Sequence, residues 1–492
     1  MMRKPTNGAD GSPADWSAVE IAARVKRRQI SAVEVLTAHI EQVESSNPIL
    51  NAIVTRLDDR AMEQARSIDD VTARGVDPGP LAGVPFTVKD LIATRDVRAT
   101  AGSLILRDFV SPWGSTAVER LSAAGAVLLG KANCPEFGLA IHTGNRLFGD
   151  TLNPLDARLS PGGSSGGDAA AVGAHMVGFG IGTDYGGSIR LPAHCTGLVS
   201  LRPTPGIVPG TGQLPFDASP SPVPPNSASM QARLQTIAPI ARSIRDLWVL
   251  LRVMAGPDGV DGNAVPIPLG SPAGQSTADV GVAWCDGDGS YPVRADVVKV
   301  VERAAEALAD RGARVINRRP PGLDEAESVY RALRNLDGLA DHKRLWQGRE
   351  DELTDYVRGW LAESRPEGTL TEFQRLTAIA DEIRLRVNRF MAQWPILLMP
   401  VASVPAFAPQ SDEFTVGRHT LYGVQIESCC RVVTLLRAPT VVVPCGQSDE
   451  GLPVGVQVIG RPYHDSQVVA VATELAEYLG PWQGRGAEGI GR

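Results

Sequence analysis

The sequence has no run of about 18 apolar residues, so we expect no membrane-spanning helix. Its polar start lacks the apolar segment of a secretory signal peptide. Six cysteines occur, but none forms a C-x-x-C pair and no histidine stands beside them at metal-ligand spacing. We therefore expect reduced thiols in a cytoplasmic protein and no bound metal.

An excess of basic residues is also lacking. The chain has 48 Lys and Arg against 55 Asp and Glu, a net charge of −7. Phosphate backbones attract basic surfaces, so this balance gives no reason to expect a nucleic-acid partner. The composition, 43% apolar and 21% charged, is typical of globular proteins. At 492 residues the chain has room for one large α/β domain or for two to three ordinary ones.

Two familiar catalytic signatures are missing. No G-x-S-x-G nucleophile elbow surrounds either of the serines singled out below, and no G-K-[ST] follows the Gly-rich loop that precedes the first of them. None of the seven histidines stands in an elbow context. A serine nucleophile in this chain would therefore need a base other than histidine.

Two Gly-flanked serines are the most informative feature that is present. Ser164 lies in S-P-G-G-S-S-G-G, and Ser188 lies in G-T-D-Y-G-G-S-I-R-L-P. The residues between them read as a helix and then a strand, which would bring both loops to one edge of a sheet. Lys89 ends an apolar strand that begins at Val84, so its burial is plausible. A buried lysine can act as a base when burial keeps it neutral.

Backbone donors accompany the second serine. The Gly-Gly turn before Ser188 would expose successive N–H groups, from Tyr185 through Gly186 and Gly187, to a developing oxyanion. Simpler interpretations exist for each part. A G-G-S-S-G-G run is often a loop or linker, and a strand lysine is often an edge residue with its amine in water. The co-occurrence of two Gly loops, two serines and a buried-strand lysine favours a catalytic site.

Strand and helix patterns alternate from residue 81 onward, which favours a buried and mostly parallel sheet. Two capping boxes, beginning at Ser17 and Ser31, predict amphipathic helices in an N-terminal helical region, 1–75. The second helix is expected to end near Glu44. The sequence does not decide whether this region packs on the main body or on a second subunit. Residues 211–229 read as a long surface loop, and residues 324–393 as a helical segment flanking the pocket.

Strand character returns near the C-terminus, although the candidate catalytic loops lie in the first half. One interleaved domain, 1–492, is therefore favoured over two tandem domains.

These motifs resemble the amidase signature family of serine hydrolases. The resemblance rests on residues 160–167, 182–192 and 88–90, and further on F-G-D-T at 148–151 and G-L-P-V-G-V-Q at 451–457. It covers most of the chain except roughly 211–235 and 260–395. The family fold implies a large mixed sheet of about eleven strands sandwiched between α-helices, with no metal or cofactor.

The resemblance also implies roles for individual residues. Ser188 would be the acylated nucleophile, Ser164 the proton relay in a cis peptide, and Lys89 the general base. Residues Tyr185 to Ser188, with Gly186 and Gly187 among them, would form the oxyanion hole. Gly138 falls where members of the family line the acyl site.

Two departures from the family pattern are evident. Leu201-Arg202-Pro203-Thr204-Pro205-Gly206 replaces the usual L-K-P-T-aromatic-G segment, and Asp168 replaces a small residue at a helix start. Neither touches Lys89, Ser164 or Ser188.

We therefore expect an amidase that hydrolyses a small C–N acyl bond, with aryl amides, carbamates and esters as further substrates. The alternative is the glutaminase subunit of a tRNA-dependent amidotransferase. The expected partner is a small-molecule amide, with no nucleic acid and no membrane, and a homodimer is left open.

Substrate selection has three candidate determinants. They are Phe137 with His142, the Pro-rich segment 205–225, and the helical segment 324–393 with Tyr330, Leu333, Leu336 and Leu339 at helical spacing. The last four residues form either ordinary core or an apolar wall above Ser188.

Overall fold

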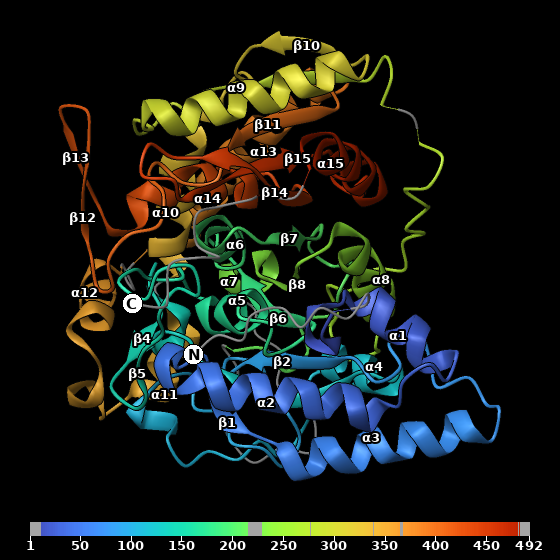
Figure 1. Ribbon diagram of the computed structural model, residues 1–492. Coiled ribbons are helices and arrows are strands. Elements are labelled where there is room, and N and C mark those ends of the chain that lie inside the picture. The colour runs from blue at the N-terminus through green and yellow to red at the C-terminus, as the bar shows by residue number, and fades with distance from the viewer. Residues whose placement is uncertain are drawn as a thin grey trace.

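A single large sheet organises the protein. The computed structural model describes residues 11–214, 229–275, 277–337, 339–364, 368–480 and 482. Its eleven-stranded sheet has the order β1-β3-β2-β6-β8-β7-β14-β15-β11-β9-β10, which runs from the bottom to the top of Figure 1. The strands are, in chain order, β1 (Ile53–Arg56), β2 (Pro85–Lys89), β3 (Val127–Ala132), β6 (Phe179–Asp184), β7 (Val199–Arg202), β8 (Thr236–Ala241), β9 (Gly281–Trp284), β10 (Arg314–Asn317), β11 (Ile396–Pro400), β14 (Thr440–Gln447) and β15 (Pro453–Ile459).

The predicted sheet is confirmed in its size and its mixed character, but the expectation of mostly parallel pairing is wrong. Four neighbouring pairs are parallel: β2 with β3 and β6, and β9 with β10 and β11. The other six pairs are antiparallel. Continuous apolar strands indicate burial on both faces of a sheet. They carry no information about direction, and here antiparallel strands in the middle of the sheet are just as buried, as the pattern of β8 shows.

Helices cover the sheet, and the described residues contain fifteen α-helices. They are α1 (Ala18–Lys26), α2 (Ala32–Leu50), α3 (Asp58–Ala73), α4 (Thr116–Ala123), α5 (Gly166–Gly173), α6 (Arg190–Thr196), α7 (Met230–Leu234), α8 (Ile244–Met254), α9 (Ala295–Asp310), α10 (Leu323–Asp337), α11 (Ala340–Trp346), α12 (Asp355–Glu363), α13 (Leu370–Met391), α14 (Ser428–Leu435) and α15 (Asp465–Leu479). Two short hairpins lie apart from the main sheet: β4 (Gly144–Asn145) with β5 (Gly149–Asp150), and β12 (Glu413–Val416) with β13 (His419–Tyr422).

The N-terminal helices pack on the body of the protein. Ser17 and Ser31 cap α1 and α2, and a complete capping box forms at Ser31. The Asp246 carboxylate of α8 accepts hydrogen bonds from the N–H groups of Ala18 and Val19 at 3.1 and 2.9 Å. A buried carboxylate at a helix start satisfies amides that lack partners within the helix.

The helix α2 is longer than expected. It continues through Pro48 to Leu50, where the sequence predicted an end near Glu44. Proline in a last turn forfeits a single backbone hydrogen bond, which the flanking contacts offset.

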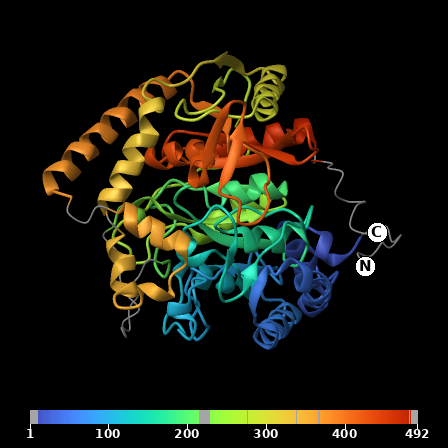
Figure 2. The ribbon, with the colours of Figure 1, turned by 90° about the vertical axis from the view of Figure 1, so that its left-hand side faces the viewer.

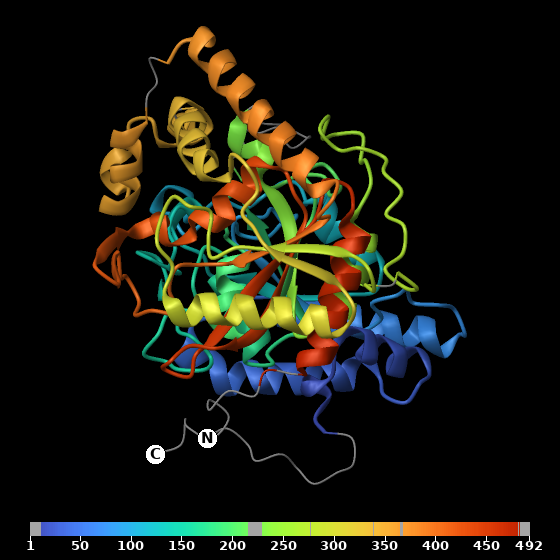
Figure 3. The same ribbon diagram turned by 90° about the horizontal axis from the view of Figure 1, so that it is seen from above.

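The segment 324–393 is helical where it is described. Figures 2 and 3 show α10 to α13 together along one side of the molecule. The predicted surface loop 211–229 lies mostly outside the described residues, because residues 215–228 are not among them. No helix of the described ranges is long and apolar enough to cross a membrane.

Candidate active site

Lys89 ends strand β2 and is completely buried. Its Nζ lies 2.6 Å from Ser164 Oγ and 3.1 Å from Thr183 Oγ1. Strand β2 lies between β3 and β6, so the side chain is enclosed by neighbouring strands. Burial disfavours the charged ammonium and lowers the pKa of Lys89 to about 8. A substantial fraction of the amine is therefore neutral near neutral pH.

The first Gly-rich loop places Ser164 against this lysine. The Gly163–Ser164 peptide bond is cis, and Gly162 has a φ of +78°. Thr143 fixes the loop, because its hydroxyl donates to the Gly162 carbonyl at 2.9 Å and accepts from the Gly166 amide at 3.1 Å. Helix α5 begins immediately after the loop.

The second Gly-rich loop is held by a buried ion pair that the sequence analysis missed. Asp184 precedes the loop and Arg190 follows it, and Arg190 Nη2 lies 2.7 Å from Asp184 Oδ1. Both side chains are fully buried, and Arg190 and Arg202 lower the pKa of Asp184 to about 2 despite its burial. The signal was present in the sequence, since two opposite charges flank the apolar loop that contains Ser188.

The loop between these charges leaves backbone amides available. Among the described residues, no hydrogen-bond acceptor is found for the N–H groups of Gly186, Gly187 and Ser188. Gly187 has a φ of +133°, and a Cβ there would lie 2.9 Å from Cys430 Cβ. Glycine is therefore required at this position by both the backbone angle and the space.

Gly138 lies directly against the Lys89–Ser164 pair. A Cβ added there would lie 2.6 Å from Leu91 Cδ1 and 3.2 Å from Ser164 Oγ, and its φ is +71°. The Gly138 amide donates to the Pro135 carbonyl at 2.8 Å, so it is not a free oxyanion donor. The contribution of Gly138 is to leave space beside Ser164.

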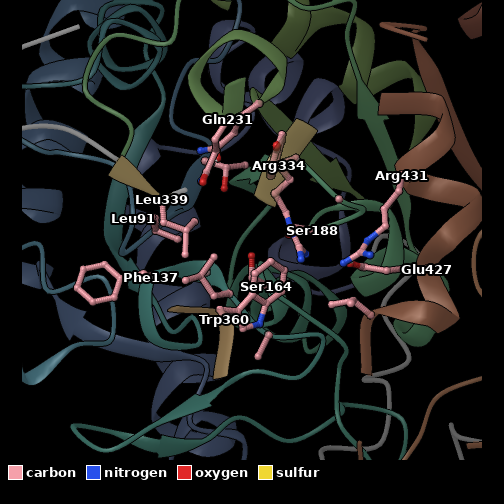
Figure 4. Close-up of a pocket in the computed structure, with 18 of the residues that line it drawn as sticks. Leu91, Phe137, Ser164, Ser188, Gln231, Arg334, Leu339, Trp360, Glu427 and Arg431 are labelled. Atoms are coloured by element: carbon pink, nitrogen blue, oxygen red, sulfur yellow. Dashed lines mark hydrogen bonds and ion pairs between the residues drawn. The ribbon is translucent and has the colours of Figure 1, made fainter. Parts of the chain in front are cut away.

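The predicted residues converge on one pocket. Ser164, Ser188, Gly138, Tyr185 and Gly186 line an empty space of about 590 Å³, its open mouth included. Lys89 and Gly187 are not among the lining residues and lie beneath this surface, because both are buried. Figure 4 shows Ser164 and Ser188 at the centre of the pocket.

The candidate selectivity residues divide between pocket and core. Phe137, Tyr330 and Leu339 line the pocket, whereas Leu333 belongs to a buried cluster beside it. His142 is not among the lining residues and instead packs edge-on against Tyr356. Most of the Pro-rich segment 205–225 lies outside the described residues.

Asp168 lies behind the site on the same face of the sheet. Its Oδ1 accepts a hydrogen bond from Thr87 Oγ1 at 2.8 Å, and Thr87 stands two residues before Lys89 on β2. Asp168 Oδ2 is buried without a hydrogen-bond partner among the described residues. Burial raises the pKa of Asp168 to about 7, while Thr87 and Lys89 favour its ionised form.

Histidines and metal-type clusters contribute nothing to this site in the described ranges. His194 is buried between the Val404 carbonyl and the Gly455 amide. The described part of the chain contains no group of three or more His, Cys, Asp or Glu side chains arranged to hold a metal.

Known proteins resemble the chain along nearly its whole length. The family model described as Amidase matches residues 34–469. A glutamyl-tRNA(Gln) amidotransferase subunit of Koribacter versatilis (strain Ellin345) is 31% identical, over 92% of this chain and 96% of that protein. Among solved structures, a bacterial aryl acylamidase of the amidase signature family has a TM-score of 0.84 and 26% identity, with 95% of this chain and 96% of that chain covered. A 6-aminohexanoate cyclic dimer hydrolase complexed with substrate has a TM-score of 0.81 and 26% identity, covering 95% and 97%.

Proposed function

The chain belongs to the amidase signature family, and on this premise we propose that it hydrolyses a carboxylic amide through an acyl-enzyme on Ser188. The observation that carries the proposal is the 2.6 Å contact between Lys89 Nζ and Ser164 Oγ at the wall of the pocket that Ser188 also lines. A serine nucleophile needs a base, and here the buried lysine with its lowered pKa is in place for that task.

The proposed reaction begins with a proton transfer. Neutral Lys89 takes the proton of Ser164, and Ser164 takes the proton of Ser188 as the Ser188 Oγ attacks the amide carbonyl. The described residues give no hydrogen bond between the two serine hydroxyls, so this link forms when Ser188 rotates toward Ser164 in the substrate complex. Hydrogen bonds of this kind often tighten only once substrate is bound.

The tetrahedral intermediate then needs stabilisation. Its oxyanion accepts hydrogen bonds from the unpaired amides of the Gly186–Ser188 segment. Lys89, through Ser164, returns the proton to the leaving amine, and the C–N bond breaks to leave an ester on Ser188. A water molecule, deprotonated by the same relay, releases the carboxylic acid and restores the serine.

A hydrolysis screen of the purified single chain tests the proposal. Amides, anilides, carbamates and esters are offered to the wild type and to Ser188→Ala. Turnover by the wild type should fall by about 10⁴-fold or more in the variant. A fluorophosphonate probe should label the wild type but not Ser188→Ala, and Ser45→Ala, on the exposed face of α2, serves as control. Full labelling of Ser188→Ala would contradict the assignment.

A second candidate function is supported by the curated relatives. The Koribacter protein is by name part of a tRNA-dependent amidotransferase, and the resemblance covers nearly the whole of both chains. In that case the chain would release ammonia from glutamine only together with partner subunits. The expectation of no nucleic-acid partner has no support from these relatives, and the acidic net charge does not exclude such an assembly.

The screen separates the two functions. Turnover of anilides by the isolated chain favours the independent amidase, whereas inertness toward every amide except glutamine favours the glutaminase subunit. One departure favours the amidase, because Pro205 and Ile207 stand where glutaminase subunits resembling this chain have Tyr and a Ser-Arg-Tyr-like stretch.

A further inference from the structure

The pocket has two chemically different sides. Leu91 and Leu339 lie to the left of the serines in Figure 4, and Arg431 and Glu427 lie to the right. Arg334, from helix α10, reaches between them from above. All five side chains line the same space. An apolar group and a charged group of one ligand could therefore be held at once.

Arg431 already has partners for its charge. Its Nη1 lies 3.4 Å from Glu327 Oε1, and its Nε lies 3.7 Å from Glu427 Oε1. Both carboxyl groups belong to buried residues. Paired, buried ions of this kind stabilise local structure and leave little attraction for a ligand.

Arg334 differs, because no buried carboxylate lies against it among the described residues. Only 6% of its surface is exposed, and its one carboxylate contact there is Glu363 Oε2, 3.3 Å from Nη2 on a side chain that is 65% exposed. Nε and Nη2 also donate to Asn335 Oδ1 at 3.0 and 2.7 Å. Nη1 is buried and has no hydrogen-bond partner in the described part of the chain.

The position of the guanidinium is fixed by stacking. Its centre lies 3.9 Å from the centroid of the Trp360 ring, and Trp360 also lines the pocket. A buried cation without a buried counter-ion is costly unless something else pairs with it. Burial and the neighbouring Arg431 lower the pKa of Arg334 to about 10, so it is still charged at neutral pH.

We propose that Arg334 binds a carboxylate of the substrate, and that the substrate class is an amide with an acidic group on one side and an apolar group on the other. A planar guanidinium with a free N–H matches a carboxylate better than any other side chain does. Leu91 and Leu339 would hold the apolar part. This inference rests on the proposed amidase function.

Glu427 does not oppose an anion at this place. Its burial raises its pKa to about 8, so the carboxyl group is mostly protonated at neutral pH. Glu363 lies outside the pocket lining and its exposed side chain can turn into water. The field on the charged side of the pocket is thus positive.

Two matched substrate pairs test the proposal. The first is para-butyramidobenzoate against para-butyramidoacetophenone, with the acid in the leaving group. The second is glutaric acid monoanilide against its methyl-ketone analogue, with the acid in the acyl group. In at least one pair the acid should have a kcat/KM about 10- to 100-fold above that of its neutral partner, as expected for a hydrogen-bonded ion pair.

The variant Arg334→Met keeps an apolar contact with Trp360 and removes the charge. It should reduce the ratio of acid to neutral kcat/KM to about one, mainly through KM. Arg331→Met, on the same helix but not in the pocket lining, should leave the ratio in place. Equal turnover within both pairs by the wild type, or an unchanged ratio in Arg334→Met, would overturn the inference.

The outcome remains readable if the chain hydrolyses none of these amides. That result would count against the proposed function itself. Binding of the two acids and their neutral partners to the Ser188→Ala protein by calorimetry then tests the carboxylate site alone. Tighter binding of an acid that is lost in Ser188→Ala with Arg334→Met supports the site, and equal binding of acid and neutral partner refutes it.

Discussion

Replacing Asp168 by asparagine should move the acidic limb of the pH–activity profile to lower pH. Lys89 must be neutral to act as a base, so activity rises as pH passes through its pKa. A negative charge near the lysine stabilises the ammonium and raises that pKa, and Asp168 is such a charge. Asparagine keeps the shape of the side chain and the contact with Thr87 while removing the charge.

The size of the shift follows from the strand. Asp168 is bonded to Thr87, and Lys89 is the next side chain on the same face of β2, about 7 Å further along. Two charges at that distance interact by about 2.4 kcal/mol at an effective dielectric constant of about 20. This energy corresponds to roughly 1.7 pKa units when Asp168 is fully ionised. Its own pKa of about 7 makes it partly protonated, so the expected shift is about one to two pH units downward.

The assay is kcat/KM for a neutral anilide, measured from about pH 5 to pH 9 for the wild type and the variant. Asp246→Asn is the control, because Asp246 is a buried carboxyl that caps α1. The control should lose stability without moving the limb. A limb that stays in place in Asp168→Asn, or that moves upward, would refute the electrostatic link between Asp168 and Lys89.

Three further changes have outcomes that follow from the site. Lys89→Ala should remove the acidic limb together with most amide turnover, and Lys89→Arg should not restore it, since guanidinium stays protonated; near-normal rates in either would exclude Lys89 as the base. Gly138→Ala should lower kcat/KM about 10- to 100-fold, because its methyl group would press on Leu91 and Ser164 and displace the relay; unchanged kinetics would show that the loop can shift freely. Arg190→Met leaves the buried Asp184 charge without its closest partner and should cost about 3–5 kcal/mol of unfolding free energy in urea; a loss below about 1 kcal/mol would show that Arg202 alone suffices.

Local sequence patterns predicted the elements better than their pairing. The strand from Val84 and the two capped helices are present because apolar period and capping chemistry are local properties. Strand direction depends on how connections cross the sheet. In the chain β7 pairs with β14, whose residues are more than two hundred positions away, and no local pattern reports such a contact.

The same limit applies to the site. The motifs contained Lys89, Ser164 and Ser188, and the structure brings two of them into contact at 2.6 Å and lines one pocket with the two serines. Arg334 lies on a helix without any motif, and its importance arises from a missing counter-ion. The lack of a partner can be recognised only after the side chains have been placed in three dimensions.

The clamp that shapes the Ser188 loop also links catalysis to the order of synthesis. Arg190 donates to the Cys430 carbonyl at 2.9 Å, to Thr434 Oγ1 at 3.0 Å and to Gln457 Oε1 at 2.8 Å. All three acceptors are translated more than two hundred residues after the serines. A chain still on the ribosome, or one cut short by a protease, can contain Lys89 and both serines and yet lack the groups that hold the loop. The hydrolytic centre is therefore assembled only when the last part of the polypeptide has folded, which keeps unfinished chains from acting as unselective hydrolases.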